Sequence, residues 1–430
     1  MTEQKQVIPE GYKQTEVGVI PNEWDVLNIS DAFDICNTLR LPLSAKVREK
    51  IAGEYPYYGP TKVQDFINEY RVDGEYALIG EDGDHFLKFD SQPQTQYVSG
   101  KFNVNNHAHL IKGKLGTAKW FYLYFKHRDI TNFLTRQGAG RYKLSKAALE
   151  LIPCPIPSNK EQTAIANALS DVDAQISELE KLIAKKQAIK TATMQQLLTG
   201  KTRLPEFALR EDGTPKGYKQ SELGEIPEDW EVEPFGNLFE DSITRKTLNL
   251  SGMVTFVGMQ DVTENAQLSN QNKIPYHEVK SGFTYFERDD VLVAKITPCF
   301  ENGKGCHAYQ LETQIGFGST EFHVLRAKKS SDSRFIYFWT TTKSLRISLE
   351  SEMVGSAGHR RVPLSAIQRY LIPCSNNKIE QTEIANILFD MDEEIHLLEQ
   401  RLNKTRKIKQ GMMQELLTGK TRLVKPEVTV

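Results

Sequence analysis

Two tandem globular domains of mixed α and β structure (class α+β), each followed by a long helix, are the fold that this sequence predicts. The chain of 430 residues is long enough for two to three domains, each with its own core. It also repeats itself, since GYKQTEVGVIPNEWDV at 11–26 returns as GYKQSELGEIPEDWEV at 217–232. A second stretch, EQTAIANALSDVDAQISELE at 161–180, returns at 380–399 as EQTEIANILFDMDEEIHLLE. Solenoid repeats have periods of roughly 20–50 residues, so this longer repeat indicates a duplicated domain with its helix.

The two globular domains are expected at 1–158 and 201–376, where short apolar runs alternate with turn formers such as GEDGD. Four runs of branched and aromatic residues predict strands: YALIG at 76–80, HAHLI at 107–111, VLVAKI at 291–296 and FHVLR at 322–326. The aromatic stretches that begin at Trp120 and Phe335 lead into polar, periodic segments and predict helices. Each domain is therefore mixed in structure.

The long helices are expected at 159–200 and 377–421, followed by a short tail at 422–430. Apolar residues recur there at alternating steps of four and three, which is a heptad seam. The seam residues are Ile165, Leu169, Val172, Ile176 and Leu179 in the central helix, and Ile384, Leu388, Met391, Ile395 and Leu398 in the C-terminal one. Two equal seams in one chain predict an antiparallel coiled-coil pair, which would hold the two domains at a set distance.

Both copies end in LLTGKTRL, and the GKT triplet in it invites comparison with a phosphate-binding loop. Such a loop needs a glycine five residues before the Gly-Lys pair, so that backbone amides can surround the phosphate. Gln195 and Gln414 occupy those positions. The triplets are therefore predicted to be helix stops, with Gly200 and Gly419 just past the last turn.

The composition predicts the cellular compartment of the protein but does not identify its binding partner. The formal net charge is -2, from 54 basic and 56 acidic residues, so a nucleic-acid surface would have to be local. No apolar run approaches the roughly 18 residues of a membrane span, and the N-terminus lacks the apolar core of a signal peptide. We expect a cytoplasmic protein without a membrane segment.

Cysteine usage fits a reducing compartment and gives no metal site. The five cysteines are an odd number and form no C-x-x-C pair, so a disulfide framework is not expected. Cys299, Cys306, His307 and His323 lack the paired spacing of zinc ribbons. The prediction is that the chain holds no metal ion.

Catalytic patterns are weak or missing. Asp261 with Glu278-x-Lys280 could form the D…E-x-K set of a metal-dependent nuclease, but this pattern arises by chance in most chains of this size. The sequence has no (N/D)PP(Y/F) methyltransferase motif and no F-x-G-x-G cofactor loop. We predict no catalytic residues, and the chain is not expected to be an enzyme by itself.

Candidate DNA contacts are basic and amide residues that cluster before the long helices and on polar loops. Arginine and lysine can contact phosphates, and arginine or asparagine can also read base edges, although ordinary solvated charges would give the same pattern. The candidates are Lys101, Asn105, Asn106, Arg136, Arg141 and Lys143 in the first half, and Lys295, Lys304, His359, Arg360 and Arg361 in the second. Arg361 and Arg141 are taken as repeat counterparts, because each precedes a Leu-Ser pair (364–365 and 144–145) and then the sequence LIPC (371–374 and 151–154).

The repeated motifs resemble a known family. GYKxTExGxIPxxW, EQxxIAxxL and LLTGKTRL together look like the specificity subunit of type I restriction–modification systems, and the resemblance covers essentially the whole chain. DGEYALIGEDG at 73–83 with YVSGKFNVNNHAH at 97–109 resembles one recurrent class of its target-recognition domains.

The resemblance implies two target-recognition domains, each reading one half of a bipartite site in double-stranded DNA. It also implies that the helix pair is a spacer and a docking surface for two methyltransferase subunits. Those subunits would carry S-adenosylmethionine and methylate adenine N6. A separate motor-nuclease subunit would use ATP and Mg²⁺, and no cofactor is expected on this chain. A stand-alone or orphan DNA-binding protein and the metal-dependent nuclease remain the alternatives.

Overall fold

The computed structural model describes residues 8–136, 141–245, 252–279, 281–356 and 358–424. It forms two compact units, and each unit contains part of both long helices. One unit comprises Met1–Glu180 with Arg401–Val430, and the other comprises Lys181–Gln400. Among the described residues, no helix combines the length and the apolar character that a bilayer crossing needs.

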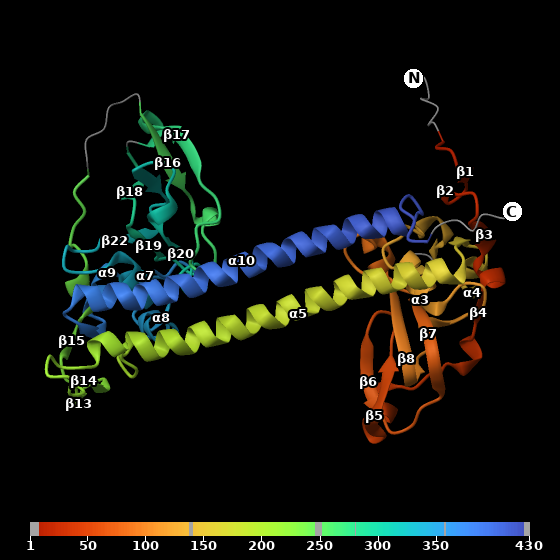
Figure 1. Cartoon of the computed structure of the whole chain (residues 1–430), viewed down its shortest axis with the longest axis horizontal. Coiled ribbons are helices and arrows are strands. Elements are labelled where there is room, and N and C mark those ends of the chain that lie inside the picture. Colours follow the sequence, from red (N-terminus) through yellow and green to blue (C-terminus); the bar gives the residue numbers. More distant parts are fainter. Residues whose placement is uncertain (1–7, 137–140, 246–251, 280, 357, 425–430) are drawn as a thin grey trace. The chain divides into compact units, whose positions relative to one another are not determined.

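The first unit is built around a six-stranded sheet in the order β4-β9-β7-β8-β5-β6, and strands β5, β6, β7 and β8 of this sheet are labelled in Figure 1. Its elements are β1 (Tyr12–Thr15), β2 (Gly18–Pro21), β3 (Asp25–Asn28), α1 (Ile29–Ala32), β4 (Phe33–Ile35), α2 (Ala45–Lys50), β5 (Ala52–Tyr58), β6 (Val63–Ile67), β7 (Val72–Gly80), β8 (Thr95–Val104), β9 (Ala108–Gly113), α3 (Ala118–Phe125), β10 (Thr135–Arg136), β11 (Tyr142–Lys143), α4 (Lys146–Glu150) and β12 (Pro153–Ile156). The strands predicted at 76–80 and 107–111 are β7 and β9, and the aromatic helix is α3. Trp120 and Phe121 of α3 are fully buried in one cluster with Ala77 and Ile79 of β7, so α3 covers this sheet.

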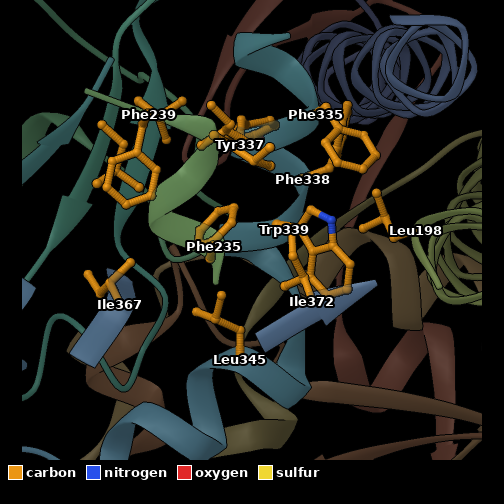
Figure 2. Packing of buried hydrophobic residues seen from close by; sticks show 14 of the residues in the cluster. Leu198, Phe235, Phe239, Phe335, Tyr337, Phe338, Trp339, Leu345, Ile367 and Ile372 are labelled. Atoms are coloured by element: carbon orange, nitrogen blue, oxygen red, sulfur yellow. The ribbon is translucent and has the colours of Figure 1, made fainter. Parts of the chain in front are cut away.

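The second unit differs, because its strands form a four-stranded sheet, β17-β16-β21-β18, and a three-stranded sheet, β20-β19-β22. Its elements are β13 (Tyr218–Ser221), β14 (Gly224–Pro227), β15 (Trp230–Pro234), β16 (Met253–Val257), β17 (Asn272–Pro275), α6 (Tyr276–Val279), β18 (Thr284–Glu287), β19 (Val291–Ala294), β20 (Gly305–His307), β21 (Ile315–Gly318), β22 (Phe322–Leu325), α7 (Ser333–Thr341), α8 (Lys343–Glu350), α9 (Leu364–Arg369) and β23 (Leu371–Ser375). Figure 2 shows its core, where Phe338 and Trp339 of α7 lie near Leu198 and Ile372. The predicted strands and aromatic helix are again present, as β19, β22 and α7.

The two predicted long helices are confirmed as α5 (Asn159–Leu198, 40 residues) and α10 (Lys378–Leu416, 39 residues). At 1.5 Å per residue each is about 60 Å long. Within the first unit Asp173 pairs with Lys409, and Glu180 pairs with Arg406 at 2.6 Å. As the residue number rises along α5 it falls along α10, which is the antiparallel arrangement.

In the second unit the same direction holds, since Lys186 pairs with Glu394 at 2.7 Å and Lys190 pairs with Asp392 at 2.5 Å. Exposed ion pairs contribute only about 0–1 kcal/mol each, so a pair such as Glu180 with Arg406 selects the register more than it stabilises the helices, whereas Lys190 and Asp392 are half-buried. The seam supplies the apolar burial. Buried seam residues are Ile165, Leu169, Leu179, Ile384, Leu388 and Ile395, and half-buried ones are Val172, Ile176, Met391 and Leu398.

A buried carboxylate at the start of each long helix joins the three repeated motifs. Glu161, 1% exposed, accepts hydrogen bonds from Trp24 Nε1 at 3.0 Å and from Arg422 Nε at 2.6 Å. Arg422 also reaches Glu23 at 2.8 Å. The hydrogen bond to Glu161 is the main cause that raises the pKa of Arg422. We call this arrangement the first clasp.

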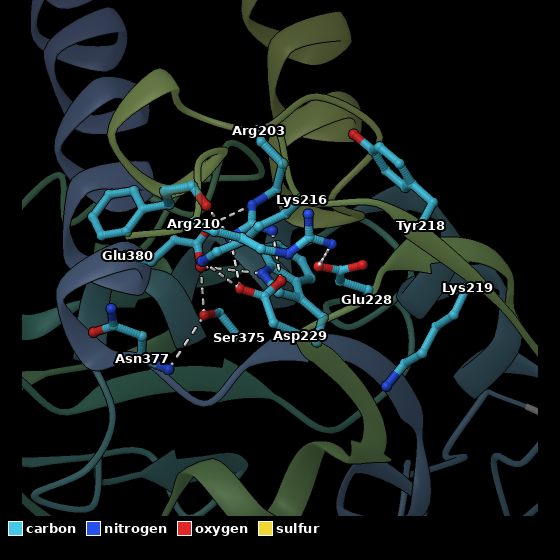
Figure 3. A network of polar contacts seen from close by, with 12 residues as sticks. Arg203, Arg210, Lys216, Tyr218, Lys219, Glu228, Asp229, Ser375, Asn377 and Glu380 are labelled. Atoms are coloured by element: carbon cyan, nitrogen blue, oxygen red, sulfur yellow. Dashed lines mark hydrogen bonds and ion pairs between the residues drawn. The ribbon is translucent and has the colours of Figure 1, made fainter. Parts of the chain in front are cut away.

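The second clasp repeats it with the corresponding residues. Glu380 accepts from Trp230 Nε1 at 3.1 Å and from Arg203 Nε at 2.7 Å, and Arg203 Nη1 reaches Asp229 at 2.6 Å (Figure 3). Ser375 Oγ donates a further bond to Glu380 at 2.6 Å. Each clasp therefore joins the tryptophan of IPxxW, the glutamate of EQxxIA and the arginine of TGKTR.

The glutamine that follows each clasp glutamate holds the aromatic helix. Gln162 Oε1 accepts from the backbone N–H of Thr117 at 2.7 Å, and Gln381 Oε1 accepts from that of Asp332 at 3.2 Å. Thr117 and Asp332 are the N-cap residues of α3 and α7. Since a helix start has backbone N–H groups without helical partners, this contact fixes where each aromatic helix begins.

The helix-stop interpretation of GKT is confirmed. Gly200 and Gly419 adopt φ of +69° and +70° directly after the long helices. A Cβ at Gly419 would lie 2.4 Å from Pro21 Cδ, and one at Gly200 would lie 2.6 Å from Pro227 Cδ. Glycine is needed there for its left-handed backbone and for the close approach of the proline of IPxxW.

We predict that Gly419→Ala destabilises the first unit by at least about 1–2 kcal/mol, because an L residue is strained at this φ and its Cβ would overlap Pro21. Gly411→Ala is the matched control, since Gly411 lies inside α10 with open space around its Cα. That change should stabilise the protein by about 0.5–1 kcal/mol. Urea unfolding measures both, and equal effects of the two variants would contradict the prediction.

Candidate nucleic-acid interface

A repeated hydrogen-bond frame lies behind the candidate DNA contacts of both halves. His109 Nε2 donates to the backbone oxygen of Leu144 at 2.8 Å, and His323 Nε2 donates to that of Val362 at 2.8 Å. The N–H of Leu144 in turn donates to Glu81 O at 2.8 Å. These bonds tie the ends of two strands to the segment that precedes α4 or α9.

The second half completes the same pattern with different residues. The N–H of Val362 donates to Lys295 O at 2.9 Å, just as Leu144 does to Glu81. The N–H of Lys295 donates to Glu321 O at 2.9 Å, as Glu81 N–H does to His107 O at 2.8 Å. Position by position, Glu81 corresponds to Lys295, and His107 corresponds to Glu321.

The frame corrects one predicted correspondence. Because Leu144 corresponds to Val362, the repeat counterpart of Arg361 is Lys143 and not Arg141. Ser145 and Pro363 are the N-caps of α4 and α9. The second half has two more residues between that cap and Cys374 than the first half has before Cys154. Alignment on L-S therefore shifted the arginines by two positions.

The charged side chains on this frame occupy different positions in the two halves. In the first half the anion is Glu81, which lies 2.6 Å from Arg40 Nη1 and 3.4 Å from Lys143 Nζ. In the second half Arg361 binds Glu321 through both carboxylate oxygens, at 2.9 and 2.8 Å. The hydrogen bond from Arg361 lowers the pKa of Glu321. The backbone is thus shared while the charge pattern it presents is not.

The structure brings most second-half candidates to one place. The N–H of Thr297 donates to Arg360 O at 2.9 Å, and the Arg360 guanidinium lies 3.5 Å from Glu301. His359 is exposed, and its backbone oxygen accepts from Arg361 at 3.3 Å. Lys304 Nζ donates to the backbone oxygen of Met259 at 3.0 Å, so its charge is used within the loop.

The first-half candidates are more dispersed. Arg136 of β10 lies over the ring of Tyr142 of β11, 5.4 Å from its centre, and Arg141 is exposed next to them. Lys101 lies on β8 and covers the ring of Tyr70 at 4.5 Å.

The two asparagine candidates have backbone contacts. Asn105 is 5% exposed, accepts from the N–H of His107 at 2.9 Å and donates to Gln64 Oε1 at 3.1 Å. These bonds explain Asn105 as a turn residue. Asn106 is exposed, and its backbone oxygen accepts from Arg40 at 3.1 Å.

Sequence reasoning missed the carboxylates that hold the basic candidates. Glu81, Glu301 and Glu321 are each distant in sequence from the cations that they bind. No local pattern marks such pairs. The internal repeat offered a usable signal for finding these carboxylates. Glu81 directly follows β7 and Glu321 directly precedes β22, and the repeat aligns both strands with strands of the other half.

The nuclease alternative finds no support in the contacts of Asp261. Asp261 is 3% exposed, and its side chain accepts from the N–H of Gly258 at 2.7 Å and from Asn270 Nδ2 at 3.0 Å. These bonds explain Asp261 as a structural carboxylate. Glu278 lies on α6, and Lys280 is outside the described residues. Within the described ranges, no three His, Cys, Asp or Glu residues gather in a metal-binding group.

Comparison with known protein families also finds two copies of one domain in this chain. The family described as "Type I restriction modification DNA specificity domain" matches it twice, over residues 21–191 and 227–406. The MjaVIII specificity subunit of a type I restriction enzyme from Methanocaldococcus jannaschii is 24% identical over 437 residues, 96% of each chain. The EcoEI specificity subunit from Escherichia coli is 34% identical over 215 residues, which is 49% of this chain and 34% of that protein.

A solved structure shares the fold. The type I restriction–modification S subunit from M. genitalium has a TM-score of 0.59 and 16% sequence identity, covering 91% of this chain and 96% of that one. The two family matches together span more than half of the sequence. The chain belongs to the family of type I restriction–modification DNA specificity domains, and it carries two of them.

Proposed function

We propose that this chain is the DNA-reading subunit of a type I restriction–modification complex and that each half reads one part of a bipartite DNA site. The observation that carries the proposal is the contrast between the halves. The buried glutamate, tryptophan and arginine of the clasps recur in both halves, and the backbone bonds of the frame recur position by position with mostly different residues. The sheets and the charged side chains on the frame differ. A repeated support with two different surfaces suits a protein that recognises two different sequences.

The basic residues near the frame are the proposed DNA contacts. Arg361 and Lys143 hold equivalent positions, and each is bound by a carboxylate. A DNA phosphate or a guanine edge could replace that carboxylate, because arginine and lysine bind all three through the same donors. Arg136, Arg141, Lys101, Lys295, His359 and Arg360 are exposed or half-buried and would add further contacts.

The remaining activities of the complex are assigned to partners. Two methyltransferase subunits would dock on the helix pair and carry S-adenosylmethionine, and a motor-nuclease subunit would use ATP and Mg²⁺. This chain would bind none of these cofactors and would contribute no catalytic residue. The chain would act in the cytoplasm, where its DNA substrate lies.

Methylation-aware sequencing of DNA from a host that expresses this chain with its partner subunits tests the proposal. We expect methylated adenines in two short motifs separated by a gap of constant length. A single uninterrupted motif would contradict the assignment of one reader to each half.

We predict that Arg361→Ala weakens specific DNA binding by about 1–3 kcal/mol, the usual value of a base-contacting arginine. Arg369→Ala is the matched control, because Arg369 is also exposed and paired with a carboxylate, Glu352 at 2.8 Å, but is the last residue of α9 and not one of the frame residues described above. Fluorescence anisotropy with the site identified by sequencing gives both affinities. Unchanged affinity together with lowered stability would make Arg361 a structural residue.

A second prediction concerns the spacing of the half-sites. Seven residues inserted after Glu180 in α5 and after Gln400 in α10 keep the heptad phase of both helices and add about 10.5 Å to each. At about 3.4 Å per base pair, the gap in the DNA site should lengthen by up to about three base pairs. The half-sites themselves should be unchanged, and sequencing of methylated sites measures both.

The control carries the same seven residues after Asp212, in an exposed turn of the second unit, where the gap should stay constant. Altered half-sites with an unchanged gap in the helix variant would mean that the helices do not set the spacing.

A further inference from the structure

A small cavity of about 90 Å³ lies in the second unit, between α10 and the residues at the end of β20. Its walls include His307, Tyr309, Tyr337, Phe389, Asp392 and Glu393. It is large enough to admit the head of one side chain or a small ion.

Aromatic rings form one wall of this cavity. The ring of His307 stacks on Tyr309, with centroids 5.4 Å apart, and on Tyr337, with centroids 5.9 Å apart. Phe389 meets Tyr309 edge to face at 5.3 Å. Burial lowers the pKa of His307 to about 4, so this ring is neutral near pH 7. These aromatic residues of the lining are therefore uncharged, and their π systems attract cations.

Two carboxylates of α10, those of Asp392 and Glu393, also line the cavity. Asp392 is neutralised by Lys190 at 2.5 Å, whereas Glu393 accepts a hydrogen bond from the phenol of Tyr309 at 3.3 Å. Burial and then the charge of Glu393 raise the pKa of Tyr309 to about 12, which keeps that phenol protonated. The guanidinium of Arg334 lies over the ring of Phe389, 5.7 Å from its centre.

The first half shows that the helix pair does not require these residues. The repeat places Asp173 at the position of Asp392, and both pair with a lysine of the other helix. Ser170 and Ala174, however, stand where the second half has Phe389 and Glu393. The same helix pairing thus exists without the aromatic ring and without the second carboxylate.

We propose that this cavity binds an organic cation, a guanidinium or alkylammonium group, between the aromatic wall and Glu393. Cation–π attraction and a partly buried carboxylate both favour a positive head group, and the same carboxylates disfavour phosphate and other anions. The shape suits the end of an arginine side chain of a partner protein or one end of a free polyamine. Neither is part of DNA, so the site is separate from base reading.

The test titrates the full chain, labelled with 3-fluorotyrosine, with ethylguanidinium and with the uncharged isostere ethylurea at matched ionic strength. ¹⁹F NMR reports on Tyr309, assigned through Tyr309→Phe. We expect a saturable shift of the Tyr309 signal with ethylguanidinium and none with ethylurea. Equal shifts with both compounds, or no saturation with either, would overturn the proposal.

Variants locate the binding. Glu393→Gln keeps the acceptor for Tyr309 but removes the charge, and it should weaken ethylguanidinium binding about tenfold. Phe389→Ser with Glu393→Ala installs the residues of the first half and should abolish binding. Glu394→Gln is the control, because Glu394 is adjacent but pairs with Lys186 at 2.7 Å outside the cavity. Unchanged affinity in Glu393→Gln would contradict the site.

A parallel titration with spermidine separates the two sources of the cation. Tighter binding of spermidine than of ethylguanidinium would assign the cavity to free polyamines, and the reverse order would assign it to an arginine side chain.

Discussion

The buried carboxylate at the start of each long helix is the interaction on which the rest of this structure depends. A carboxylate withdrawn from water without partners costs several kcal/mol, so Glu161 and Glu380 must be matched by donors in the folded state. For Glu161 the donors are Trp24, 137 residues away, and Arg422, 261 residues away. The three repeated motifs therefore form one contact in each unit.

The clasps also explain why the helices pair in antiparallel fashion. Arg203 follows the end of α5 and binds Glu380 at the start of α10, and Arg422 follows the end of α10 and binds Glu161 at the start of α5. Each clasp thus holds the end of one helix beside the start of the other. The seam then buries apolar side chains between them, and exposed ion pairs such as Glu180 with Arg406 select the register.

Much of this could be predicted from the sequence, since local patterns and the internal repeat carry it. Heptad spacing predicts the starts of both long helices to within one residue, whereas the predicted ends at 200 and 421 lie two and five residues beyond Leu198 and Leu416. The turn-bounded apolar runs predict β7, β9, β19 and β22. The contacts between remote segments could not be predicted in this way. Nothing near Arg361 in the chain indicates Glu321, and the two-residue shift that makes Lys143 its counterpart became visible only through the bonds of His109 and His323.

A double-mutant cycle between Glu161 and Arg422 tests the central role of the clasp most directly. Glu161→Ala, Arg422→Ala and the double variant are compared by urea unfolding, with hydrogen exchange at the start of α5 to follow the first unit. The account predicts a coupling free energy of about 2–4 kcal/mol, because each single variant leaves a buried or half-buried charge without its partner. A coupling free energy near zero would mean that the pair does not hold the unit together, and would contradict the account.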